Sequence, residues 1–300
     1  MKESKLKDLS KEQLEDYISQ GLSFREIGNL YRVSVRTARR RAKFLGINTK
    51  IYDSDRNKCF DIHAFDSIDT EEKAYWLGFL YADGCVISKS NTVQLALMYS
   101  DYDHVLKFKK FMKDTRDNDV VKKTLVKTNN KYHELAMYQI RSKHLKQTLI
   151  QLGCVPRKSL ILKFPDMKIF KDFNLVYDFI RGYVDGDGSL TTYSRSRFII
   201  SILGTIDFLS GVQKIFPQFL NINKHAKDNK VYDIRCSCKK ADYVSYKLYG
   251  HATVYLDRKF KKFATLCRLY NASEKSNNIG EGCDANTEIT SEITKGPEES

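Results

Sequence analysis

Two stretches of this 300-residue sequence decide its fold: WLGFLYADG at positions 76–84 and IRGYVDGDG at positions 180–188. Each stretch ends a segment whose apolar residues recur at helical spacing. Small residues stand four positions apart in both: Gly78 with Ala82, and Gly182 with Gly186. Because glycine inside a helix costs about 1 kcal/mol relative to alanine, its presence at matching places indicates two helices whose backbones pack closely against each other.

An aspartate and a glycine follow each of these seams, as Asp83-Gly84 and Asp187-Gly188. A carboxylate at a helix C-terminus faces the negative end of the macrodipole, which costs about 0.3–1 kcal/mol. If the helices lie side by side in one direction, the two carboxylates also emerge together and repel. A Mg²⁺ ion held by both would relieve the two penalties, so the pattern predicts a metal site at Asp83 and Asp187. For one Asp-Gly alone, an ordinary helix stop remains the alternative.

The two stretches belong to an internal repeat, since aligning residues 74–86 with 178–190 also aligns 94–112 with 198–216. Each half predicts a helix, a two-stranded segment, a helix, a second two-stranded segment and a last helix. The expected elements are 71–83, 85–99, 102–113, 120–140 and 143–152, then 175–187, 189–203, 206–216, 222–236 and 239–249. Thr70 and Asn174 are the expected N-caps of the two opening helices. We therefore expect an α+β fold with two subdomains, 70–170 and 171–270, related by a pseudo-dyad.

Residues 1–50 predict a small all-α domain of three helices: KEQLEDYISQ after Leu9-Ser10, FREIGNLY after a Ser23/Glu26 capping box, and VRTARRRAKFLG capped by Ser34. Residues at helical spacing are expected to form its shared core: Leu14, Tyr17, Ile18, Phe24, Ile27, Leu30, Val33, Val35, Ala38, Ala42 and Leu45. The third helix carries Arg36, Arg39, Arg40, Arg41 and Lys43. The domain resembles a helix-turn-helix, whose second helix lies in the DNA major groove. Any small helical bundle with a basic surface stays the alternative.

Two other segments lack a sustained hydrophobic period. Residues 51–69 are expected to be a linker. Residues 271–300 are rich in Ser, Thr, Asn, Gly and Glu and lack aromatic residues, so we expect a disordered acidic tail.

Composition narrows the class of protein. The chain has 51 Lys and Arg against 37 Asp and Glu, a formal net charge of +14, which favours a polyanionic partner such as nucleic acid or an acidic membrane surface. No apolar run reaches bilayer length and no signal core precedes the first helix, so we expect a soluble cytoplasmic protein without a membrane segment. The seven cysteines form no CxxC pair, which favours free thiols and no structural metal.

The two opening stretches resemble the two copies of the LAGLIDADG motif, and residues 71 to about 265 resemble a single-chain LAGLIDADG homing endonuclease. The resemblance implies an αββαββα unit present twice, with saddle-shaped antiparallel sheets over the DNA. It also implies a monomer that cuts both strands of a long asymmetric double-stranded DNA site, with one active site per motif. Mg²⁺, or another divalent cation such as Mn²⁺, would be bound by Asp83 and Asp187. The motif's first aspartate is kept as Asp185 in the second copy and is replaced by Tyr81 in the first. Because this position is not an expected metal ligand, the change concerns local packing more than cleavage.

Phosphodiester hydrolysis also needs a cation to offset charge on the phosphate. Lys158 and Lys259 each stand in an Arg-Lys pair beyond the last helix of their half. The family places a basic residue near each scissile phosphate, so we assign these two lysines that catalytic role. A plain surface lysine is the alternative for each.

The family reads DNA with the exposed faces of its sheets. SLTTYSRSRF alternates, which predicts that one strand face carries a row of polar and basic residues, Thr191, Tyr193, Arg195 and Arg197. Lys89 and Gln94 are the weaker counterparts in the first half. A solvated strand face is the competing explanation.

The sequence therefore predicts a site-specific, Mg²⁺-dependent double-strand DNA endonuclease of the intron-homing type. Two other functions stay open. A maturase on the same scaffold would bind intron RNA and would not need both acids. A non-catalytic DNA-binding regulator would need only the basic surfaces and the N-terminal helices.

Overall fold

The computed structural model describes residues 9–19, 22, 24–47, 59–128, 130–194, 197–224 and 231–265. Its first three helices are α2 (Lys11–Ser19), α3 (Phe24–Leu30) and α4 (Val35–Phe44). Reciprocal hydrogen bonds between Ser10 and Gln13 cap α2, and the Ser34 hydroxyl accepts from the Thr37 N–H at the start of α4. These caps explain why the helices begin where they do.

The three helices share a hydrophobic cluster of their own, separate from that of the remaining chain. The predicted core residues belong to this cluster or pack against it, with one exception. Leu30 is 60% exposed, because α3 ends there and the turn at Tyr31 leads the chain away. The expected cap Ser23 lies outside the described residues.

The first αββαββα unit follows the predicted element order. Its elements are α6 (Glu71–Ala82), β1 (Gly84–Val86), β2 (Thr92–Met98), α7 (Tyr102–Phe111), β3 (Val121–Thr128), β4 (Lys131–Arg141) and α8 (Lys143–Gln151). The strands form an antiparallel sheet in the order β1-β2-β4-β3. Val93, Leu95 and Leu97 alternate into the core, so one face of the sheet packs against α7 and α8.

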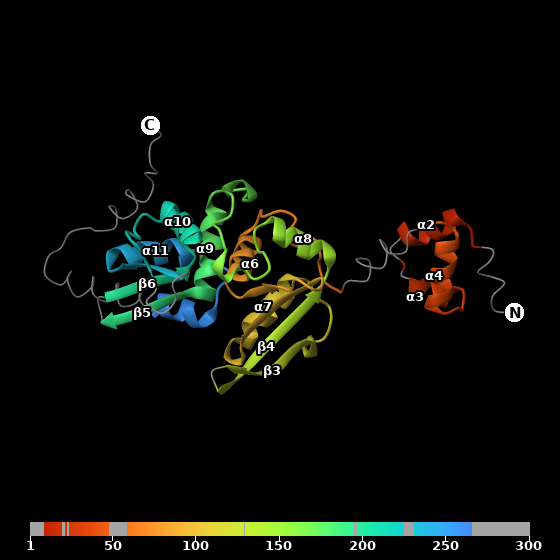
Figure 1. Cartoon of the computed structure of the whole chain (residues 1–300), viewed down its shortest axis with the longest axis horizontal. Coiled ribbons are helices and arrows are strands. Elements are labelled where there is room, and N and C mark those ends of the chain that lie inside the picture. Colours follow the sequence, from red (N-terminus) through yellow and green to blue (C-terminus); the bar gives the residue numbers. More distant parts are fainter. Residues whose placement is uncertain are drawn as a thin grey trace, which may run out of the picture.

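The second unit repeats this arrangement with α9 (Asn174–Asp187), β5 (Gly188–Ser194), β6 (Arg197–Gly204), α10 (Ile206–Ile215), β7 (Ile222–Lys224), β8 (Tyr232–Ser237) and α11 (Lys239–Tyr249). Its antiparallel sheet has the equivalent order β5-β6-β8-β7. Helices α10 and α11 cover its inner face. A last helical segment occupies residues 257–265. Figure 1 shows the two units side by side, with α6 and α9 between the sheets.

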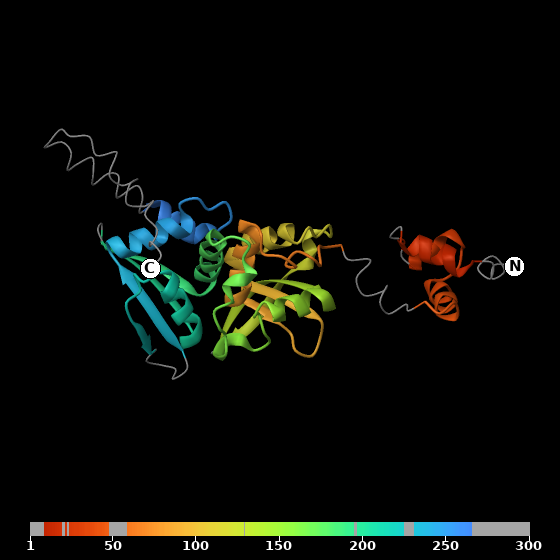
Figure 2. The same ribbon diagram turned by 90° about the horizontal axis from the view of Figure 1, so that it is seen from above.

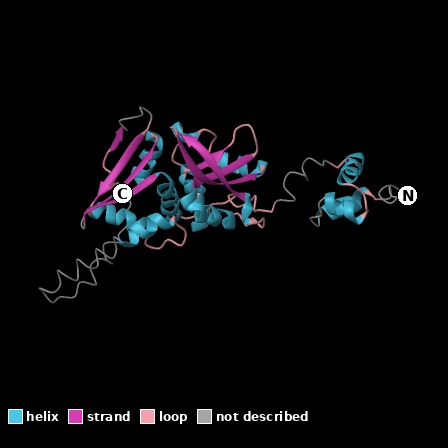
Figure 3. Cartoon of the chain, turned by 90° about the horizontal axis from the view of Figure 1, so that it is seen from below, coloured by secondary structure: helices cyan, strands magenta, loops and turns pink. Residues whose placement is uncertain are grey.

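Helices α6 and α9 join the two units through one continuous hydrophobic core. Figure 2 shows them together at the centre of the body, and Figure 3 shows both sheets on the same side of it. An ion pair also crosses this boundary, because the buried Arg181 on α9 donates to the partly exposed Glu71 carboxylate on α6 at 2.7 Å. The two sheets therefore form one framework around the paired helices.

Two predictions were wrong: the N-cap of α9 and the linker that precedes α6. Asn174 is the first residue of α9 and not its cap; its N–H donates to the Asp172 carboxylate at 2.7 Å. Residues 59–69, expected as linker, are ordered turns in which Ala64, Phe65 and Ile68 are buried in the main core. The sequence pattern did not predict this burial, because the apolar side chains of an irregular segment show neither a helical nor a strand period.

The remaining part of the expected linker, 51–58, and the expected tail, 271–300, lie outside the described residues. Among the described helices, none combines the length and the apolar character that a membrane crossing requires.

Candidate active site

The predicted close packing of the two motif helices is confirmed at both glycines. A Cβ atom at Gly78 would fall on the carbonyl oxygen of Phe179, and one at Gly182 would fall on the carbonyl oxygen of Tyr75. Tyr75 and Phe179 occupy equivalent positions of the repeat, so each helix meets the other in the same way. The seam is thus the local pseudo-dyad that the repeat predicted, and it leaves no room for a side chain at either glycine.

This packing brings the two motif ends together. Asp83 is the C-cap of α6, and Asp187 is the last residue of α9. A Cβ at Gly186 would collide with the Cβ of Ala82 and lie 3.1 Å from the Asp83 Oδ2 atom. The Asp83 side chain therefore lies against the last turn of the opposite helix, one residue before Asp187.

The two carboxylates influence each other electrostatically. Burial, together with the negative charge of Asp187, raises the pKa of Asp83 to about 6. Loss of surrounding water also raises the pKa of Asp187, although that side chain is exposed on one side, while Lys158 and Lys259 act in the opposite direction. An elevated pKa with a nearby like charge is typical of carboxylates arranged to share a cation.

Lys158 and Lys259 are buried, so the alternative of a plain surface lysine is wrong for both. The Lys158 ammonium donates to the carbonyl oxygens of Ala82 (2.9 Å) and Gly84 (2.5 Å), on either side of Asp83. Lys158 therefore stabilises the negative end of the first motif helix, a role that the sequence analysis had given to the metal alone.

The Lys259 ammonium contacts the second motif in the same way. It donates to the carbonyl oxygens of Val184 (2.5 Å), Asp185 (2.6 Å) and Gly188 (2.8 Å). Burial lowers the pKa of Lys259 to about 8, while the charge of Asp185 opposes this shift. Both lysines lie close enough to affect the pKa of Asp83 and of Asp187, so the structure brings all four predicted residues into one region.

The motif position with Tyr81 in one half and Asp185 in the other has a packing role. Tyr81 donates a hydrogen bond to the Leu152 carbonyl at the end of α8. Asp185 is buried and accepts from Tyr75 (2.7 Å), Tyr249 (2.6 Å) and the Leu256 N–H (2.7 Å). Tyr81 thus connects its motif helix to the end of α8, and Asp185 connects its own to the end of α11, with different chemistry.

The predicted row of DNA-contacting residues is only partly on one strand. Thr191 is exposed on β5. Arg197 is the first residue of the next strand, β6, and pairs with Ser194, so it does not continue the alternation of β5. Arg195 lies outside the described residues, and the side chains of Tyr193 and Arg197 are not described.

In the first half, the solvent face of the sheet has candidates that the sequence argument missed. Gln94 on β2 accepts a hydrogen bond from the Gln139 side-chain amide on β4 at 2.6 Å. Lys122 on β3 pairs with Met137 and is exposed on the same face. Gln139 and Arg141, which alternate with buried Tyr138 and Ile140 on β4, were the available signal. Lys89 is exposed in the turn before β2.

On α4, the side chains of Arg36, Arg39 and Arg40 are exposed as expected. Arg41 has a structural role, because its guanidinium donates to the Leu9 carbonyl with its Nη2 at 2.8 Å. Gly28 allows the turn between α3 and α4, since a Cβ there would lie 2.8 Å from the Val33 carbonyl oxygen.

Neither the protein-family models nor the curated protein sequences contain a match to this chain. Solved structures with a similar fold include the LAGLIDADG homing endonuclease I-GzeII in complex with its DNA target, at 14% identity and a TM-score of 0.43, covering 73% of this chain and 95% of that one. They also include I-SmaMI bound to uncleaved DNA in the presence of calcium ions, at 12% identity, a TM-score of 0.41, and coverage of 73% and 93%. The LAGLIDADG homing endonuclease I-LtrWI bound to target DNA matches at 10% identity, a TM-score of 0.41, and coverage of 71% and 94%. At these identities the likeness concerns the fold alone.

Proposed function

We propose that this protein is a site-specific DNA endonuclease of the LAGLIDADG homing type, which makes double-strand breaks with the help of Mg²⁺. The observation that carries the proposal is the meeting of Asp83 and Asp187 at the ends of two equivalent helices, with two buried lysines beside them. A binding protein has no need to bring two carboxylates together, since their repulsion costs stability.

The donor set fits a hard divalent cation. Asp83 and Asp187 supply carboxylate oxygens, which Mg²⁺ prefers, and water and phosphate oxygens commonly complete its coordination. The raised pKa of Asp83 supports this fit, because a bound cation would offset both its burial and the charge of Asp187. When bound, the metal would supply Lewis-acid activation of the phosphate and of a water nucleophile.

The lysines have two roles in this proposal. Lys158 and Lys259 hold the backbone on each side of the aspartates, so the carboxylates keep one orientation. Their positive charge lies close enough to the two carboxylates to lower the pKa of each, and in this proposal it offsets negative charge on the reacting group. We assign them as electrostatic and positioning residues, since their ammonium hydrogens are engaged by backbone carbonyls.

DNA binding is assigned to two surfaces. The exposed faces of the sheets, with Thr191, Gln94 and Lys122 among their residues, would contact the grooves. The helices α3 and α4 would act as a helix-turn-helix that places Arg36 and its neighbours in a major groove. Tethering a second DNA contact to the saddle raises the affinity and lengthens the recognised site.

The test is cleavage of a supercoiled plasmid that carries the intronless DNA flanking the gene. We expect a linear product with Mg²⁺. Asp83→Asn and Asp187→Asn should each abolish the linear product while gel-shift binding stays, and any open-circle product would show that the other motif still cuts one strand. Asp103→Asn, an exposed aspartate on α7, is the matched control and should cut as the parent does.

The two rival functions give different results in this experiment. Stable binding of the DNA without cutting by the parent protein would support a regulator. Tight binding of the intron RNA, with neither cutting nor tight DNA binding, would support a maturase. If both aspartate variants still produce linear DNA, the assignment of the site is wrong.

A further inference from the structure

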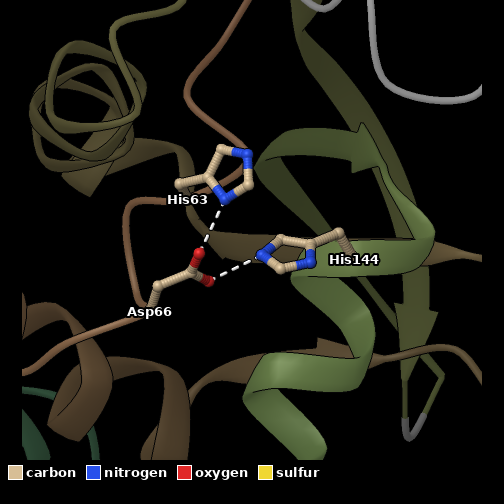
Figure 4. Close-up of side chains that lie close together, drawn as sticks. All are labelled: His63, Asp66 and His144. Atoms are coloured by element: carbon tan, nitrogen blue, oxygen red, sulfur yellow. Dashed lines mark hydrogen bonds and ion pairs between the residues drawn. The ribbon is translucent and has the colours of Figure 1, made fainter. Parts of the chain in front are cut away.

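A cluster of two histidines and an aspartate lies apart from the paired aspartates. His63 and Asp66 belong to the turns that lead into α6, and His144 lies in the first turn of α8. The Nδ1 atom of His63 and the Nε2 atom of His144 each lie 2.6 Å from an oxygen of Asp66. Figure 4 shows both imidazole rings directed at this one carboxylate.

The three possible ligand atoms lie within 4.8 Å of one another, and no other group of three such residues does so in the described part of the chain. In a tetrahedral zinc site with bonds of roughly 2.0–2.1 Å, neighbouring ligand atoms are about 3.3 Å apart. The present nitrogen–oxygen contacts are shorter than this, as hydrogen bonds are. Because the His63 side chain is 63% exposed and the His144 side chain 37% exposed, both rings have room to rotate toward the spacing of zinc ligands.

The backbone that carries the ligands is already fixed. Buried Ala64 and Phe65 lie between His63 and Asp66, and the His63 N–H donates to the Asp61 carboxylate at 2.9 Å. On the other side, buried Leu145 anchors α8 next to His144. A site on a fixed backbone loses less entropy when a metal binds than a site on an unstructured segment does.

A further contact has the form expected around a bound metal. The Thr148 hydroxyl, one turn after His144, donates to the Asp66 Oδ1 atom at 3.3 Å. Hydrogen bonds of this kind orient ligating carboxylates and tune metal affinity. Imidazole nitrogens with one carboxylate favour zinc over magnesium, which prefers oxygen ligands only.

We propose that His63 Nδ1, His144 Nε2 and the Asp66 carboxylate bind a Zn²⁺ ion, with water as the fourth ligand. The ion would join residues 59–69, the segment that enters the first motif helix, to α8. It would therefore fix the point at which the N-terminal part of the chain meets the first subdomain. The expectation of no structural metal had considered cysteine pairs alone.

The test uses the full-length chain carrying Asp83→Asn and Asp187→Asn, so that the proposed magnesium site cannot account for binding. After treatment with a chelator, ZnCl₂ is titrated by calorimetry in excess Mg²⁺. We expect one equivalent to bind. Asp66→Asn and His144→Ala should each weaken this binding at least tenfold, whereas His251→Ala, an exposed histidine elsewhere, should leave it unchanged.

A second measurement identifies the atoms. In ¹⁵N-histidine NMR spectra, zinc should shift the Nδ1 signal of His63 and the Nε2 signal of His144, and their other ring nitrogens much less. Thermal unfolding without zinc checks that the variants fold like their parent. No binding at one equivalent, unchanged affinity in both ligand variants, or shifts confined to other histidines would overturn the proposal. Because cutting needs only Mg²⁺ in the first assay, the two proposals can fail independently.

Discussion

Replacing Asp83 by asparagine should stabilise the metal-free protein at neutral pH while it abolishes cutting. Burial and the charge of Asp187 raise the pKa of Asp83 from 3.8 to about 6. The pKa of Asp83 is thus higher in the folded protein than in the unfolded chain. The protonated carboxyl therefore makes its full contribution to the free energy of unfolding below about pH 4. This contribution is lost as the pH rises through 6. Asparagine resembles the protonated acid and keeps that contribution at every pH.

The expected gain follows from the same shift. A difference of about two on the pKa scale corresponds to about 3 kcal/mol at pH 7.5. Since the Asp83 side chain keeps partial contact with solvent, we expect roughly 1–3 kcal/mol. For a body of this size that equals an increase in Tm of about 2–10 °C.

The assay is thermal unfolding in EDTA at pH 4.5, 6.0 and 7.5, for the parent and for Asp83→Asn. The stability difference should be largest at pH 7.5 and small at pH 4.5, and saturating Mg²⁺ should reduce it by stabilising the parent. The exposed Asp119→Asn serves as control and should change stability by less than about 0.5 kcal/mol. A gain of equal size at pH 4.5 and 7.5, or no gain at pH 7.5, would refute the reasoning.

Three further changes test the seam, the buried network and the N-terminal helices. Gly182→Ala should destabilise the fold by about 1–3 kcal/mol or more in urea, because its Cβ would fall on the Tyr75 carbonyl; an unchanged midpoint would contradict the close packing. Tyr75→Phe removes a hydrogen bond to the buried Asp185 carboxylate and should lower the free energy of unfolding by about 1–3 kcal/mol; a loss below about 0.5 kcal/mol would contradict this. Arg36→Ala should weaken binding of the target DNA and lower the salt slope of log K by about 1, whereas Lys11→Ala on α2 should leave that slope unaltered.

The sequence predicted the helices and strands well wherever local signals define them. Thr70 and Ser34 cap the helices that they were expected to cap, and α7 and α11 begin at the residues expected. The glycine seam was also predictable, because glycine at equivalent positions of two helices is costly unless the backbones meet there. Its reciprocal contacts at Gly78 and Gly182 confirm that inference.

Features that depend on tertiary contacts were not predictable in the same way. The buried side chains of Lys158 and Lys259 engage carbonyls that lie more than seventy residues earlier in the chain, and no local pattern marks such a partner. Phe65 lies in a polar segment without a period, although it is 1% exposed. Arg197 was expected on the same strand as Thr191 but begins β6, because SLTTYSRSRF has neither glycine nor proline to mark where β5 ends.

The unlike residues at positions 81 and 185 have a consequence for evolution. A homodimer must use the same residue on both sides of its symmetry axis, so a mutation there acts twice. In this chain the two halves have separate coding sequences. The motif helix is hydrogen-bonded to the end of α8 by Tyr81 in one half and to the end of α11 by Asp185 in the other. Each half is therefore free to diverge, and under the proposed function a DNA duplex bound by both sheets need not be palindromic.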